Sequence, residues 1–97
     1  MRQFDVVTLS DGTHALILQA DLLDKFSWRV AAPLVRASEF RPTPKLHIAI
    51  RIGRTDYIAV IDKMAAIHTK SMKRVVASVA DRQWDIRRAL DLVFVGV

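Results

Sequence analysis

The chain has 97 residues, no cysteine and a formal net charge of +5. This length suits one domain spanning residues 1–97, and 52% hydrophobic with 26% charged residues is the composition of a folded chain rather than a disordered one. The missing cysteines exclude disulfides, thiolate metal sites and a cysteine nucleophile, and they favour the reducing cytoplasm. No apolar run approaches the roughly 20 residues of a membrane helix, and no signal peptide precedes the first strand, so we expect a cytoplasmic protein without membrane contact.

Charge is distributed unevenly along the chain. Residues 1–48 hold six basic and five acidic side chains, whereas residues 49–97 hold nine and five. The second half is therefore expected to attract an anionic partner, either nucleic acid or an acidic protein segment. A solvated basic surface that keeps the protein soluble is the alternative.

The first half of the chain predicts short strands joined by turns. Residues 4–9 are rich in β-formers, and the Asp11-Gly12 pair after them predicts a hairpin with a return strand over residues 15–20. A further strand is expected over residues 28–34. Within it, Pro33 predicts a sheet edge or a strand end, because proline cannot donate a ladder hydrogen bond.

Residues 46–52 form the clearest strand of the sequence. Apolar and polar residues alternate there with period two, which places four apolar side chains on one face, namely Leu46, Ile48, Ile50 and Ile52. A second strand is expected over residues 57–61 after a turn, and a weaker extended stretch over residues 65–68.

The period changes near the end of the chain. From Asp85 onward the apolar residues recur at helical spacing, namely Ile86, Ala89, Leu90, Val93 and Phe94. Ser78 and Asp81 suggest a weak capping box at the start of this helix, and Gly96 a cap at its end. We therefore expect a mainly β fold with one C-terminal α-helix, in which the helix packs on a small antiparallel barrel-like sheet.

The sequence offers little for catalysis or metal binding. The three histidines, His14, His47 and His68, fall on different expected elements without ligand spacing, so no metal or cofactor is expected. No glycine-rich phosphate loop or nucleophile elbow is present, and no catalytic residue is assigned. His14, Arg51 and Asp56 are one combination that would suit RNA cleavage, but scattered charges at strand ends explain them more simply.

Two apolar features near the C-terminus call for a partner surface. Trp84 falls off the apolar stripe of the expected helix, which is typical of an aromatic interface anchor or of a tryptophan lying flat on its own subunit. The tail Phe94–Val97 is apolar, so it must either be buried against the sheet or lie at an interface. Both alternatives stay open at this point.

Four segments together resemble the CcdB family, the gyrase-poisoning toxins of type II toxin–antitoxin systems. They are the opening Met1-Arg2-Gln3-Phe4, the turn Asp21-Leu22-Leu23-Asp24, the strand Val30–Leu34 and the ending 85–97. The ending is similar, position by position, to the family's Asp-Ile-Lys-Asn-Ala-Ile-Asn-Leu-Met-Phe-Trp-Gly-Ile. The order and spacing of the four segments carry the resemblance across nearly the whole chain.

The resemblance implies a CcdB/Kid-type barrel-like sheet and a homodimeric, non-enzymatic toxin of plasmid maintenance. Such a toxin binds the DNA gyrase A subunit and traps the cleaved complex. An acidic CcdA-like antitoxin reverses the poisoning, and only through it does the toxin reach operator DNA in transcription autoregulation. By position, the gyrase-binding residues are Leu22, Leu23, Asp91, Phe94, Val95, Gly96 and Val97, with Trp84 and Arg88 flanking them on the same helix.

Two positions depart from the family. Val95 stands where the family has a Trp that stacks on an Arg of gyrase, and Asp91 stands where it has an Asn. One alternative function is therefore a degenerate toxin that acts as an antitoxin-binding autoregulator. Another is a ribonuclease like the related Kid and MazF toxins, although their N-terminal Gly-rich and Arg-Pro motifs are missing here.

Overall fold

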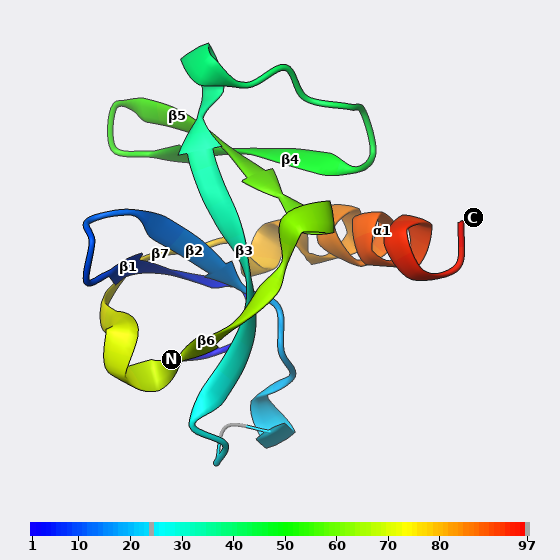
Figure 1. The fold of residues 1–97 in the computed structure, drawn as a ribbon. Coiled ribbons are helices and arrows are strands. Elements are labelled where there is room, and N and C mark those ends of the chain that lie inside the picture. Colours follow the sequence, from blue (N-terminus) through cyan, green and yellow to red (C-terminus); the bar gives the residue numbers. More distant parts are fainter. Residues whose placement is uncertain (24, 97) are drawn as a thin grey trace.

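A computed structural model describes residues 1–23 and 25–96 and shows a curled antiparallel sheet with one α-helix packed against it (Figure 1). The strands are β1 (Asp5–Leu9), β2 (His14–Ile17), β3 (Trp28–Arg36), β4 (His47–Ile52), β5 (Thr55–Val60), β6 (Ala65–His68) and β7 (Met72–Ser78). The helix α1 (Gln83–Phe94) follows them.

The strands are hydrogen-bonded in the order β4-β5-β3-β2-β1-β7, and β6 pairs separately with β3. All strand pairings among the described residues are antiparallel, and the sheet curls into a half-barrel. This confirms the fold predicted from the sequence. No helix within the described part of the chain is long and apolar enough to cross a membrane.

The prediction that Pro33 marks a sheet edge or a strand end is wrong. Pro33 lies inside β3, the strand that pairs with β2, β5 and β6, and it is opposite Ala15 of β2. On the other side of β3, β6 pairs with Trp28–Ala31 and β5 with Leu34–Arg36. Pro33 falls in the gap between those two partners. No strand there needs a hydrogen bond from an N–H at this position, so a proline is tolerated.

Strand β7 was not predicted. Its residues do not alternate cleanly between apolar and polar, and its pairing with β1 shifts register between Val6 and Val7 and again between Thr8 and Leu9. Such shifts break the period of two on which a sequence-based prediction depends. The predicted return strand is also shorter than expected, because β2 ends at Ile17.

The predicted start of the helix is wrong and its predicted end is confirmed. Ser78 ends β7 instead of capping a helix, and Arg82, the N-cap of α1, makes no side-chain capping bond. At the other end Gly96 has a φ of 81°, and its N–H donates to the Asp91 carbonyl oxygen at 3.1 Å. Glycine adopts this left-handed conformation without a steric penalty, as expected of a C-terminal cap.

The main core lies between the sheet and α1. Ile86 and Ala89 of the helix are fully buried there, while Leu90 and Val93 pack at its margin. A smaller core on the other face of the sheet gathers Val7, Ala15, Ile17, Ala31 and Met72. Phe94, the last residue of α1, continues the helical spacing of these apolar residues, but its side chain is 71% exposed.

Candidate functional site

The outward face of α1 carries a stripe of exposed residues at helical spacing. Trp84, Arg88, Asp91 and Val95 follow one another at intervals of three or four residues, and each is exposed. The Arg87 guanidinium lies 5.1 Å from the centre of the Trp84 ring, a cation–π contact that holds the indole on the surface. This arrangement confirms that Trp84 is exposed and gives the helix a mixed apolar and charged outer face.

The chain end continues this face. Phe94 and Val95 are 71% and 69% exposed, and Gly96 is exposed after them. Residues 94–96 of the apolar tail are therefore not buried against their own sheet. Val97, the last predicted contact residue, lies outside the described residues.

Leu22 and Leu23 lie on the short 3-10 turn η1 (Asp21–Leu23), away from α1 in the chain and in Figure 1. Leu22 is 82% exposed and Leu23 37%. Phe26 and Trp28, which follow the turn and were not predicted as site residues, are 61% and 55% exposed. The single chain thus presents two apolar surfaces, the η1 surface (Leu22, Leu23, Phe26 and Trp28) and the α1 face.

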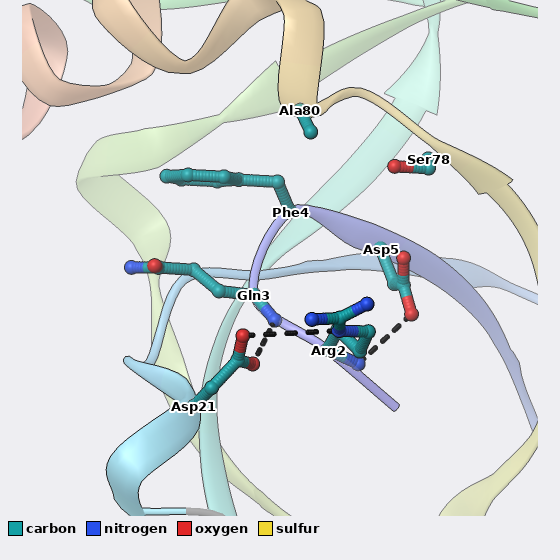
Figure 2. A pocket seen from close by; sticks show the side chains of 7 residues that line it. All are labelled: Arg2, Gln3, Phe4, Asp5, Asp21, Ser78 and Ala80. Atoms are coloured by element: carbon teal, nitrogen blue, oxygen red, sulfur yellow. Dashed lines mark hydrogen bonds and ion pairs between the residues drawn. The ribbon is translucent and has the colours of Figure 1, made fainter.

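Asp21 fixes the η1 turn to the N-terminal segment, as Figure 2 shows. Its Oδ1 accepts a 2.7 Å hydrogen bond from the Gln3 N–H, and its Oδ2 lies 3.9 Å from the Arg2 Nε. Together with Phe4, Asp5 and residues of the β7–α1 connection, these groups line a cavity of about 310 Å³. Two of the segments that carry the family resemblance therefore touch directly, and this contact positions Leu22 and Leu23.

The structure does not assemble the ribonuclease group considered from the sequence. Arg51 and Asp56 face each other across the β4–β5 hairpin at 3.8 Å, and both are exposed. His14 instead forms a hydrogen bond between its Nδ1 and the Thr8 hydroxyl at 3.1 Å. Its ring packs edge-on against Tyr57, with ring centres 5.3 Å apart. Since neighbouring strand residues point to opposite faces, Asp56 and Tyr57 diverge, and His14 is separated from Arg51.

A different polar group surrounds His14. Arg36 pairs in register with Tyr57, and both line a cavity of about 360 Å³ with His14, Glu39 and the turn at residues 11–13. Sequence patterns did not single out Arg36, Glu39 or Tyr57, because only the pairing of β3 with β5 brings them beside β2. We call this group the His14 cavity.

Asp11 lies at the rim of the His14 cavity. The Thr13 hydroxyl, at 2.6 Å, and then the Thr13 N–H, at 3.0 Å, donate to its carboxylate and hold the pKa of Asp11 below its usual range. The cavity thus combines two carboxylates, a guanidinium and an imidazole. Among residues 1–23 and 25–96, no cluster of three or more His, Asp or Glu side chains is arranged to hold a metal ion.

The fold is similar to that of several solved toxins. One structure, described as Mycobacterium tuberculosis toxin MazF-mt6, has a TM-score of 0.76 at 14% identity and matches over 96% of both chains. An endoribonuclease in complex with its cognate antitoxin from Mycobacterial species has a TM-score of 0.78 at 16% identity, over 96% of this chain and 93% of that one. MazE-MazF from Deinococcus radiodurans has a TM-score of 0.72 at 16% identity, over 97% and 95%. These similarities define the fold class, which is the one that these small toxin domains share.

Within that class, residues 3–96 match the family model of the CcdB protein, and the chain belongs to the CcdB family. No curated protein matches the chain. Membership of the CcdB family supports a toxin role. One of the neighbouring endoribonucleases was solved with its own cognate antitoxin.

The expectation that the protein is not an enzyme is contradicted by the same structures, because proteins with this fold include endoribonucleases. That expectation came from the resemblance to a non-enzymatic toxin family and from the missing nucleophile and phosphate-loop motifs. RNA cleavage needs only a base, an acid and a cation near the phosphate, so the absence of those motifs excludes nothing.

Proposed function

We propose that the protein is the toxin of a type II toxin–antitoxin system and that the α1 face binds the A subunit of DNA gyrase and traps its cleaved complex. The observation that carries this proposal is the exposure of Trp84, Phe94 and Val95 on one helix, each at 69% or more. Exposed aromatic and aliphatic side chains at the centre of a surface are typical of binding hot spots.

The η1 surface supports the same proposal in a second way. Its exposed Leu22 matches a family position assigned to gyrase contact, and it is anchored through Asp21. Because η1 and α1 are separate on one chain, a homodimer offers a route by which η1 and α1 of two copies meet in one surface. In this proposal an acidic antitoxin covers the toxin, and the pair represses its own operon and serves plasmid maintenance.

Val95 gives the sharpest test of the gyrase proposal. A tryptophan at this position would stack on a gyrase arginine, and an aromatic interface anchor with a stacked cation contributes about 2 kcal/mol or more. We therefore expect the native protein to poison such a gyrase weakly, and Val95→Trp to increase poisoning by roughly 10 to 100-fold. The measurement is the amount of linearised plasmid in a gyrase cleavage assay.

Val75→Trp is a matched control, because Val75 is also exposed, at 46%, but lies on β7 rather than on α1. An equal gain from both variants would indicate non-specific apolar binding and contradict the proposal. If the native protein, Val95→Trp and the double variant Val95→Trp with Asp91→Asn are all inactive, gyrase is excluded as the target.

The His14 cavity favours a second candidate function, cleavage of RNA. The imidazole of His14 and the carboxylate of Glu39 are suitable for acid–base catalysis, and Arg36 is suitable for holding the phosphate. In this reaction the RNA 2′-hydroxyl attacks the adjacent phosphorus, the base takes its proton, and the acid protonates the departing 5′-oxygen. The similarity of the fold to that of endoribonucleases supports this candidate.

Incubation with end-labelled RNA tests this second candidate. If the cavity is catalytic, His14→Gln should lower the cleavage rate by about 10² to 10⁴-fold, the usual range for loss of a general acid or base. Arg51→Ala is the control, since Arg51 is exposed and paired with Asp56 outside the cavity. Cleavage that is unchanged in His14→Gln and in Arg36→Ala would show that this cavity is not the active site.

A further inference from the structure

A third polar cavity, a cleft, lies between α1 and the chain that leads into β4. It encloses about 230 Å³ and is lined by Lys45, His47, Ile48, Arg82, Asp85 and Arg88. Three cationic side chains face one carboxylate, so the cleft carries an excess of two positive charges. None of the residues assigned to gyrase binding except Arg88, and none of the His14 cavity, belongs to it.

Asp85 holds the two arginines in place. Its Oδ2 accepts from the Arg82 Nε at 3.1 Å, and its Oδ1 lies 3.9 Å from an Arg88 terminal nitrogen. Arg82 also donates from Nη1 to the Ala49 carbonyl oxygen at 2.8 Å, which ties its guanidinium to β4. Two planar guanidinium groups fixed around one cleft are well suited to bind the oxygens of a tetrahedral anion.

The turn before β4 presents Lys45 to the same cleft. The Thr43 N–H donates to Nδ1 of His47 at 2.8 Å, and the His47 N–H donates back to the Thr43 carbonyl oxygen at 3.1 Å. With Nδ1 as acceptor, the ring proton is on Nε2, which donates to Asp62 at 2.9 Å. The imidazole is thus committed to holding the turn, and Lys45 is kept at a φ of 71°, an uncommon conformation for a residue other than glycine.

We propose that this cleft binds a backbone phosphate of single-stranded nucleic acid and that the neighbouring base stacks on Trp84. Trp84 is adjacent to Asp85, lies one helical turn before Arg88 and is 69% exposed. The Arg87 guanidinium lies over one face of the ring, 5.1 Å from its centre, and unpaired bases commonly stack on aromatic side chains with added contacts to arginine. A peptide carboxylate would use the arginines but not the ring, so the combination favours nucleic acid over an acidic protein segment.

The test is a fluorescence anisotropy titration of labelled oligothymidine with the full chain, repeated between about 50 and about 200 mM salt. Trp84→Ala is expected to weaken binding at least roughly fivefold, the lower end of what one stacked base contributes, and Trp84→Phe to recover part of the loss. Arg88→Ala and Lys45→Ala should each weaken binding and reduce the slope of log affinity against log salt by about 0.7.

Arg54→Ala is the matched control, since Arg54 is exposed in the turn at the opposite end of the β4–β5 hairpin and its loss removes the same charge. It should leave the affinity within about twofold, as expected for a cation outside the site. An equal loss in Arg54→Ala and Arg88→Ala would show general charge attraction and overturn the proposal. Polyglutamate that binds as tightly as the oligonucleotide, with the same dependence on Arg88, would assign the cleft to an acidic peptide and overturn it too. Gyrase takes no part in this measurement, so its outcome is independent of the proposed target.

Discussion

Phe4 and Lys45 show how the same unusual backbone conformation arises for different reasons. Among the described residues other than glycine, only these two have a positive φ, of 70° and 71°. Phe4 is 5% exposed within the main core, its N–H donates to Ile17 and its carbonyl oxygen accepts from Val79, so packing and hydrogen bonds over-determine its conformation. Lys45 is exposed and has no comparable packing. The hydrogen bonds between Thr43 and His47, rather than packing, hold the turn that contains Lys45.

Replacement of Lys45 by glycine separates strain from function. The left-handed conformation costs a residue other than glycine about 1 to 2 kcal/mol. Glycine avoids this cost, but its greater conformational entropy in the unfolded chain lowers the free energy of unfolding by about 0.5 to 1 kcal/mol. We expect Lys45→Gly to raise the free energy of unfolding by roughly 0.5 to 1 kcal/mol in urea denaturation. Lys45→Ala removes the same charge but keeps the strain, so it should not be stabilised. Equal stability of the two variants would show that the turn is unstrained.

The helix α1 divides its two faces between stability and binding. Its inner face buries Ile86 and Ala89 completely, whereas its outer face and its end expose Trp84, Phe94 and Val95. The periodicity of the sequence predicted the inner face correctly. For Phe94, which continues the same spacing, it left burial and exposure open, because the helical period does not show how far the packing beneath the helix extends.

A pair of changes in α1 tests this division. Ile86→Ala should lower the free energy of unfolding by about 2 to 5 kcal/mol, since it removes a fully buried side chain. Deletion of residues 95–97 should leave the melting temperature within a few degrees of the parent, because Val95 is exposed. The same deletion should abolish any effect on the target. A truncated chain that is destabilised as much as Ile86→Ala would mean that the tail belongs to the core.

At the scale of the whole molecule, the single chain exposes more surface than its mass requires. Its accessible surface is 6204 Å², against about 5,600 Å² for a compact monomer of 11.0 kDa. Six large apolar side chains contribute to this surface, because each is more than half exposed, namely Leu22, Phe26, Trp28, Trp84, Phe94 and Val95. A curled half-barrel with two apolar surfaces is suited to a second copy of itself.

We therefore expect a homodimer in solution. Light scattering at micromolar concentration should give about twice the mass of the chain, since apolar surface of this extent favours association. A monomer mass for the native protein at the same concentration would contradict the expectation.

The sequence alone determined the features that depend on local period and local turn chemistry. The period of two predicted Ile48 and Ile50 inside β4, the helical period predicted Ile86 and Ala89 inside α1, and Gly96 marked the end of the helix.

The tertiary structure decided what depends on strand pairing. Only the register of β3 with β2, β5 and β6 explains Pro33 in a central strand and brings Arg36 and Tyr57 beside His14. Only the packing of α1 beside β4 brings Lys45 to Arg82 and Arg88. These residues are far apart in the chain, and no pattern of spacing encodes a contact that a neighbouring strand or helix must complete.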